Sequence, residues 1–583
     1  MNNIFLKSFC LLLGVISIYG CKPDKNVQQH ISELNIRISK DPAKLNPIFN
    51  PSSSAREVFQ YIYLPLADYH PEDLILSPIL IEEIPEEKSD DDNIIYTVNI
   101  REDAVWSDGQ PITGLDYAFT VKAIKLPLSN TGAWRSLVNN IKDVKVDPSN
   151  PKQFSIYVDK NYMLALEVCL TIDLLPAHIY DKENALAVIN VSDDFIVNEA
   201  IYQKDASIMQ FVNFFNSPEA SRDILEGAGP YQLSNWNTNQ SIILQKKKAY
   251  WGDKYPDIPF LRAGVEKMIF KMMPDDNTAV TSLKNGEVDI ITLRNSDVFA
   301  NLRKEDEASD KFQFFTPAII RYYYIALNND RPQLQDKNVR RALAHLLDID
   351  KIINTIDYGL GRRTIGHFNP AKAYYNDKLA PIGYDAEQAK KLLQNAGWQD
   401  TDNNGILDKQ IDGKKEELSI EILISGNALG ESVALLFQNN AKEVGVNINI
   451  TRKKSSLISK EHTSTRKYDM AALAIVQDAS PDDPYSRWHS SMAIPGERNY
   501  ANYRSEAADK IIEQIRETRD EEKRSYLYLR LQEIMYEDQP VIFLYTPQKK
   551  IVVSKDIQAS STAKRPGYLA NTFYKKAALE KVK

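Results

Sequence analysis

The sequence is poor in the residues that usually mark a catalytic or metal-binding site. Its 583 residues include three cysteines and seven histidines, with no Cys-x-x-Cys pair and no two histidines at a helical metal-ligand spacing. The Gly-x-Ser-x-Gly, His-Glu-x-x-His and Gly-x-x-x-x-Gly-Lys-Ser/Thr motifs are absent too. We therefore predict neither an enzyme nor a cofactor, although a hydrolase with paired carboxylates stays open because such pairs leave no sequence pattern.

The chain also lacks long basic runs. Its 71 Lys and Arg against 79 Asp and Glu give a net charge of −8, and basic triplets such as 246–248 and 452–454 are isolated. This pattern argues against a nucleic-acid partner. A hydrophobic fraction of 43% with 26% charged residues is typical of a packed globular protein.

The longest apolar run without a charge lies near the N-terminus. Lys7 precedes the run Phe9–Ile18, which is too short to span a bilayer, and Gly20-Cys21 follows it. This order is typical of a secretory signal peptide, and Ile18–Cys21 resembles a bacterial lipobox. We predict a signal peptide at 1–20, a linker at 21–30 and an extracytoplasmic or periplasmic protein anchored to a cell membrane by lipid on Cys21. The alternative is a signal peptide followed by a chance cysteine.

A second apolar stretch, Leu164–Leu175, is interrupted by Glu167 and Asp173 and is therefore no membrane span. It contains Cys169, the one cysteine that remains once Cys10 leaves with the signal peptide and Cys21 carries lipid. No intramolecular disulfide can then form. We expect Cys169 to be a small core residue.

Hydrophobic periodicity predicts a mixed α/β protein. Alternating apolar residues indicate strands at 34–38, 94–100, 154–158 and 265–271, and helical spacing indicates helices at 337–353, 385–396 and 521–536. Asp385 is the expected N-cap of the second helix and Gly397 ends it. Pro540 should stop the third helix before a strand at 541–545.

One loop resembles the start of a calcium site. Asp400, Asp402 and Asn404 place oxygens at alternate positions before Gly405, and Asp408 follows at the ninth position. The twelfth position is Ile411, so the strongest ligand of such a loop is missing. We interpret the segment as a turn held by its side chains, without a metal.

Several segments occur in a characteristic order along the mature chain. Together they resemble the solute-binding protein family 5 of ABC importers, which comprises oligopeptide-, dipeptide- and nickel-binding proteins. Arg340 and Arg341, within one segment, are expected on the polar side of their helix. The segments are Val105–Thr113, Gly227–Tyr231, Ala249–Trp251, Gly286–Ile290, Ala326–Asn329 followed by Val339–Leu343, and Tyr384–Trp398.

The resemblance implies an α/β chain with the two-lobed periplasmic-binding-protein type II fold and a monomeric state. In this numbering, lobe 1 covers 31–324 with an extra subdomain at about 66–224, lobe 2 covers 325–530, and 531–583 returns to lobe 1. Such lobes close around a ligand by hinge motion.

The resemblance also implies a short peptide held between the lobes and delivered to an ABC permease. A carboxylate of lobe 2 receives the charged N-terminus of the peptide, and Asp478 is the first candidate because it follows an apolar run. Asp482 or Asp483 could take this role, or all three could cap a turn before Pro484. Other open functions are the binding of a nickel chelate or an oligosaccharide, and a surface sensor or adhesin lipoprotein.

Three further residues are candidate ligand contacts. Ser53 and Ser54 follow Leu45-Asn46-Pro47, where the family has its first-lobe contact loop. Their alternative role is the N-cap of a helix at 56–63. Trp488 is a candidate aromatic residue of the pocket, and its alternative role is lobe packing.

Overall fold

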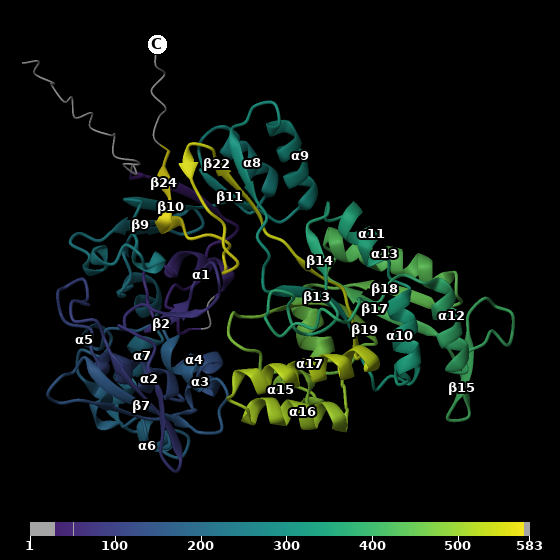
Figure 1. Cartoon of the computed structure of the whole chain (residues 1–583), viewed down its shortest axis with the longest axis horizontal. Helices are drawn as coiled ribbons and strands as arrows, with labels where there is room; N and C mark the ends of the chain where they lie inside the picture. Colours follow the sequence, from purple (N-terminus) through teal and green to yellow (C-terminus); the bar gives the residue numbers. More distant parts are fainter. Residues whose placement is uncertain (1–29, 50–51, 577–583) are drawn as a thin grey trace, which may run out of the picture.

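The computed structural model describes residues 30–49 and 52–576. The expected signal peptide, the lipidation site Cys21 and nearly all of the linker lie outside these residues. Within them, the chain forms two α/β lobes joined by two extended segments (Figure 1). The two-lobed α/β fold predicted from the sequence is confirmed.

The first lobe is built on a seven-stranded sheet with the order β12-β22-β11-β1-β10-β9-β8. Helices α8 (Asp276–Lys284) and α9 (Ser296–Asp306) share a core with β11 and β22 on one face. The strands are β1 (Leu34–Ile38), β8 (Tyr231–Asn237), β9 (Ser241–Lys246), β10 (Lys267–Met272), β11 (Ile290–Leu293), β12 (Phe312–Phe315) and β22 (Lys550–Ser554).

A smaller four-stranded sheet extends this lobe downward in Figure 1. Helices α2 (Gly114–Lys125), α3 (Gly132–Val138) and α7 (Ala206–Phe215) lie with it, and α4 (Ala165–Leu170) contains the buried, free Cys169. Cys169 is therefore a core residue, as predicted. The strands, in sheet order, are β4 (Glu87–Ser89), β5 (Asn93–Asn99), β7 (Gln153–Asp159) and β6 (Ile141–Val146).

The second lobe is built on a five-stranded sheet with the order β18-β17-β19-β13-β20. Its strands are β13 (Arg321–Leu327), β17 (Ser419–Ile424), β18 (Asn447–Arg452), β19 (Met470–Val476) and β20 (Val541–Phe543). Its main helices are α10 (Lys337–His345), α11 (Ile349–Thr355), α12 (Ala386–Asn395), α13 (Ala428–Lys442), α16 (Glu506–Glu517) and α17 (Glu521–Asp538).

The chain crosses between the lobes twice. It leaves the seven-stranded sheet after β12 for β13, and it returns after β21 (Tyr545–Pro547) to β22. The two crossing segments touch, because the Lys549 amide donates to the Pro317 carbonyl at 3.0 Å. The resemblance implies that the chain returns to lobe 1 at residue 531. That residue lies within α17, before the chain crosses back after β21.

Two elements differ from the sequence expectation. The predicted helix at 337–353 is two helices, α10 and α11, because the Asp348 side chain accepts from the Lys351 amide and starts a new helix. The predicted strand at 541–545 divides at Leu544. Its first part, β20, joins the five-stranded sheet, and β21 pairs with β14 (Gly361–Arg363).

A search of the described residues for a helix with the length and hydropathy of a membrane span finds none.

Candidate functional site

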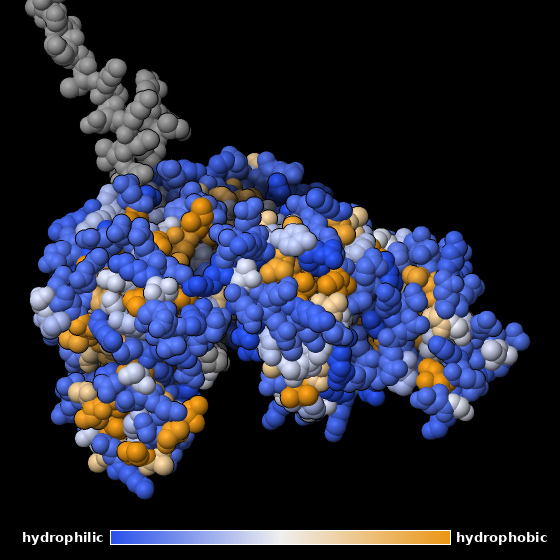
Figure 2. Space-filling view, turned by 60° about the horizontal axis from the view of Figure 1, so that its bottom comes forward, coloured by the Kyte–Doolittle hydropathy of each residue, from blue (hydrophilic) through white to orange (hydrophobic). Residues whose placement is uncertain are grey.

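A cavity of about 370 Å³ lies between the two lobes. Figure 2 shows the surface hollowed between the lower part of the first lobe and the second lobe. The first lobe supplies most of the lining, and the second lobe supplies Ile320 and the segment Gln477–Ser480. First-lobe residues include Arg56 of α1 (Ser53–Phe59), Asp68, Tyr69, Trp134, Tyr162, Glu167, Asp173, Lys564 and Arg565.

Asp478 reaches this cavity because β19 ends just before it. The Gln477 amide donates to the Ile320 carbonyl at 2.9 Å, and the Lys372 ammonium donates to the carbonyls of Asp478 and Ala479 at 2.7 and 2.8 Å. The loop is therefore fixed by its backbone, and the Asp478 side chain stays 77% exposed. Its carboxylate meets the Arg565 guanidinium of the first lobe at 3.2 Å.

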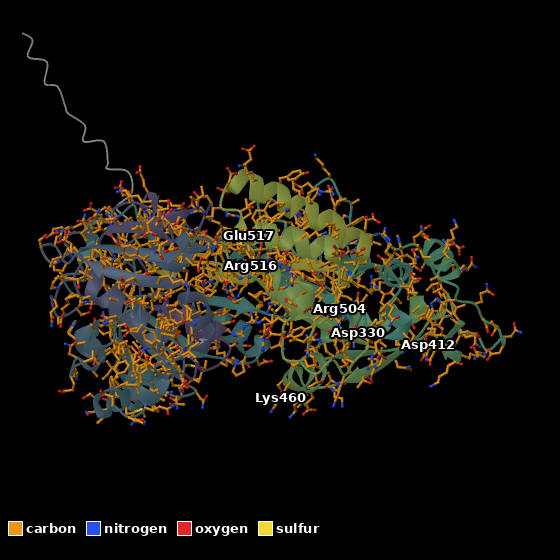
Figure 3. All side chains as sticks on the ribbon, turned by 90° about the horizontal axis from the view of Figure 1, so that it is seen from below. Asp330, Asp412, Lys460, Arg504, Arg516 and Glu517 are labelled. Atoms are coloured by element: carbon orange, nitrogen blue, oxygen red, sulfur yellow. The ribbon has the colours of Figure 1, made fainter. Side chains whose placement is uncertain are left out.

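The other two candidate carboxylates form contacts within the second lobe. The buried Asp482 carboxylate accepts from the Tyr374 hydroxyl at 2.8 Å and from the Gln477 amide nitrogen Nε2 at 2.9 Å. Asp483 pairs with Arg516 at 3.1 Å, at the end of α16 that faces the first lobe in Figure 3. Neither residue lines the cavity, so the structure separates Asp478 from its two sequence neighbours.

The serine candidates occupy the first turn of α1. Ser52, one residue earlier than expected, is the N-cap and accepts from the Ala55 amide at 3.2 Å. Ser54 is buried, whereas Ser53 is exposed and lines a smaller cavity that adjoins the main one. The N-cap role expected for Ser53 or Ser54 is therefore wrong, because Ser52 already supplies the capping oxygen.

Trp488 does not line the cavity. It belongs to α15 (Tyr485–Trp488), is 3% exposed, and its ring centroid lies 5.6 Å from that of His367 inside the second lobe. Its position thus matches the packing alternative.

Sequence reasoning missed an acidic group at the first-lobe side of the cavity. Asp68, Glu167 and Asp173 line this side, and Asp68 forms an ion pair with Lys564. Burial raises the pKa of the Asp173 carboxyl to about 7. The negative Asp68 adds to this shift, and the cations of Arg56 and Lys564 oppose it. The sequence did contain a sign of this acidic group, because Glu167 and Asp173 interrupt an otherwise apolar stretch.

Two polar atoms of the lining lack partners. Among the described residues, the buried Tyr69 hydroxyl and the buried Gln477 carbonyl oxygen Oε1 form no hydrogen bond. Such groups cost about 1–3 kcal/mol each when they stay unsatisfied. A hydroxyl can donate and an amide oxygen can accept, so a polar ligand could satisfy both.

The calcium-like loop lies far from this cavity. Oxygens of Asp400, Asp402 and Asp408 come within 4.8 Å of one another. The Lys415 ammonium, however, lies 2.6 Å from Asp402 and 3.3 Å from Asp408. A cation of the chain itself thus pairs with two of these three carboxylates. The neighbouring hairpin carries Asp412, at the end of the second lobe remote from the first lobe (Figure 3).

The sequence matches a known family over most of its length. The profile described as bacterial extracellular solute-binding proteins, family 5 Middle, matches residues 76–494. The oligopeptide-binding protein AppA of Bacillus subtilis is 25% identical over 523 residues, which cover 89% of this chain and 87% of the relative. The nickel-binding periplasmic protein of Escherichia coli is 24% identical over 496 residues, which cover 83% of each chain.

Solved structures share the fold. The structure of Bacillus subtilis AppA in complex with a nonapeptide matches with a TM-score of 0.70 at 22% identity, over 94% of this chain and 100% of that chain. The structure of Campylobacter jejuni NikZ in complex with Ni(L-His) matches with a TM-score of 0.69 at 21% identity, over 93% of this chain and 99% of that one. The two-lobed architecture is thus common to proteins with different ligands.

Proposed function

Because the chain belongs to the bacterial extracellular solute-binding proteins of family 5, we propose that it captures short peptides between its lobes and delivers them to an ABC permease. The observation that carries the proposal is the cavity between the lobes. Its lining combines carboxylates, guanidinium groups and unsatisfied polar atoms. A peptide offers the complementary ammonium, carboxylate and backbone groups.

We assign the ammonium of the peptide N-terminus to Asp478. An ammonium that leaves water needs an opposite charge and hydrogen-bond acceptors. Asp478 offers both at the cavity, and its present partner Arg565 comes from the opposite lobe. Asp68 adds negative charge across the cavity, and Asp173 adds more when its carboxyl is ionised.

The binding free energy of the ligand would favour closure of the lobes. Ligand contacts on both lobes bias the molecule toward the state in which these surfaces lie close together. The two crossing segments, at Pro317 and Lys549, are the elements about which the lobes would rotate. Capture and release would then follow from the same motion.

We further propose that lipid on Cys21 anchors the protein on the outer side of a cell membrane. A lipid anchor of this kind keeps a binding protein near its permease without a membrane-spanning helix. Mass spectrometry of the membrane-extracted protein tests this directly. A diacylated N-terminal Cys21 peptide is the expected result, and an unmodified or absent Cys21 would contradict it.

Native mass spectrometry of the purified protein, followed by fragmentation of what co-purifies, tests the ligand class. Peptides of a few residues with mixed sequences are expected. A metal chelate or a sugar would instead support the alternative solutes, and a protein that stays empty when peptides are added would contradict peptide capture. The last result would favour a sensor or adhesin role.

A further inference from the structure

One residue of the first lobe is buried in a hydrophobic cluster of the second lobe. Met163 lies in the turn between β7 and α4 and is 5% exposed. The other buried residues of its cluster lie between 322 and 543, in the second lobe. Its sequence neighbours Tyr162 and Ala165 belong to the core of the first lobe instead. Met163 therefore crosses the interface between the lobes.

The turn that carries Met163 is held by its own backbone. The Tyr162 amide donates to the Asp159 carbonyl and the Ala165 amide donates to the Tyr162 carbonyl, both at 3.1 Å. Leu164 packs against the clusters of both lobes. An unbranched thioether fills irregular gaps more readily than a branched side chain, so methionine suits a contact that must form and break.

An ion pair supplies a second contact between the lobes. The Arg519 guanidinium, in the turn between α16 and α17, lies 2.5 Å from the Glu87 carboxylate of β4. Glu87 also accepts from the Tyr96 hydroxyl at 3.2 Å, and the buried Arg524 holds the turn by donating to the carbonyls of Thr518 and Arg519. Both charged partners are partly exposed, so the pair assists the apolar contact and contributes less than it.

These contacts lie away from the segments that cross between the lobes. In Figure 1, α4, α15 and α16 lie lower than the crossing segments, and Figure 3 shows Arg516 and Glu517 at the end of α16 that faces the first lobe. Rotation about the crossing segments would therefore withdraw Met163 from its cluster as the lobes open. Water would then reach apolar surface on both sides of the contact, which is unfavourable.

We infer that Met163, assisted by the pair of Glu87 and Arg519, is a latch that stabilises the closed arrangement of the lobes without contacting the ligand. Tyr162 and Leu164 line the main cavity, but Met163 does not. Its contribution should therefore be the same for every ligand, because it depends only on the equilibrium between open and closed lobes. The lining would set which ligand binds, and the latch would set how long any ligand stays. The consequence for ligand release rests on the proposed function.

Stopped-flow measurement of ligand release tests this consequence. Met163→Ala removes most of the apolar contact and should speed the dissociation of two short peptides of opposite net charge by the same factor, about 10-fold. Met163→Leu keeps an apolar side chain of similar volume and should stay within about 2-fold of the natural protein. Met209→Ala is the matched control, since Met209 is a partly exposed residue of α7 in the first lobe. It should leave both dissociation rates unchanged.

A second measurement needs no ligand. Dilute hydrogen peroxide oxidises exposed methionines, and mass spectrometry gives the rate at each one. Met163 should oxidise faster than the fully buried Met268 and Met535, because opening of the lobes exposes it while the core of each lobe stays intact. Glu87→Gln should speed the oxidation of Met163 about 2-fold and leave the other two unchanged, because the lobes then open more often.

The outcomes separate the latch from the proposed function. Dissociation that Met163→Ala leaves unchanged, or changes by different factors for the two peptides, would overturn the inference alone. Oxidation of Met163 as slow as that of Met268, with and without Glu87→Gln, would also overturn it. Failure of every peptide to bind would overturn the proposed function, and the oxidation rates would then decide about the latch. Thermal unfolding checks that the variants fold. If Met163→Ala does not, Glu87→Gln replaces it with an expected acceleration of about 2-fold.

Discussion

Arg565 of the first lobe and Asp478 of the second lobe form an ion pair across the cavity, with 3.2 Å between Nη2 and Oδ1. The Asp478 side chain is 77% exposed, so the pair contributes little to stability. Both groups therefore stay accessible to a charged ligand. The Arg565 side chain also lines the smaller cavity beside the main one.

The change Asp478→Asn should weaken peptide binding about 10-fold or more, because it removes the carboxylate that we assign to the ligand ammonium. The midpoint of thermal unfolding should stay the same. Calorimetric titration with a short peptide measures the effect. Asp483→Asn is the matched control, since Asp483 belongs to the same loop but pairs with Arg516 away from the cavity lining. Equal losses in both variants would argue against the assignment.

Stability should depend on pH through Asp173. Its pKa is about 7 in the native protein, against about 3.9 for a free aspartate. Between these values the native state binds a proton that the unfolded chain does not, so stability falls as the pH rises toward 7 and stays low above it. Asp173→Asn should raise the free energy of unfolding by roughly 2–4 kcal/mol at pH 8 and far less at pH 4.

Urea unfolding at both pH values measures this difference, and Asp91→Asn in an exposed loop is the control. A variant that gains the same stability at both pH values would show that Asp173 does not titrate in this range.

Ligand binding gives a second readout. A peptide ammonium near Asp173 favours the ionised carboxylate, so affinity should rise from pH 5 to pH 8; Asp68, Arg56 and Lys564 are the charges that face this group.

Calcium should leave the protein unchanged. The Lys415 ammonium already pairs with Asp402 and Asp408, and Asp400 accepts from the amides of Asn404 and Gly405. The unfolding temperature in millimolar calcium and in excess chelator should therefore be the same. A rise of several degrees with calcium would show that the ion displaces Lys415 and that the loop is a metal site.

Arg340→Ala should be strongly destabilising. The buried Arg340 guanidinium donates to the carbonyls of Asp538, Gln539, Leu334 and Gln335 at 2.7–3.2 Å, and so it satisfies the end of α17. Its loss leaves several buried carbonyls without donors and should cost about 3–5 kcal/mol. Arg341→Ala is the matched control and should cost about 1 kcal/mol, since Arg341 is more exposed. Chemical denaturation of both variants measures the contrast.

The burial of Arg340 could not be predicted from helical periodicity. Helical spacing correctly places Val339, Ala342 and Leu343 on the buried face of α10. The same spacing predicts Arg340 on the polar side, yet it is 6% exposed. Periodicity gives only the mean polarity of a helix face. Arg340 is buried because it donates to the Asp538 carbonyl at the end of α17, 198 residues away along the chain.

The local structure and the family could be predicted from the sequence alone. Apolar alternation defined β1, β5 and β7, and the cap at Asp385 with the positive φ of Gly397 defined α12, because these features depend on near neighbours. Asp478 was likewise marked by its place after an apolar strand.

Which charged side chains meet depends on how the lobes fold. Asp478 and Asp482 are four residues apart, yet one faces the cavity and the other is held inside the second lobe by Tyr374 and Gln477. The smaller cavity beside the main one is lined by Arg56, Arg321, Lys549 and Arg565, which come from three distant parts of the chain. These cations are neighbours only in the folded chain, and electrostatic energy depends on distance in space and not along the chain.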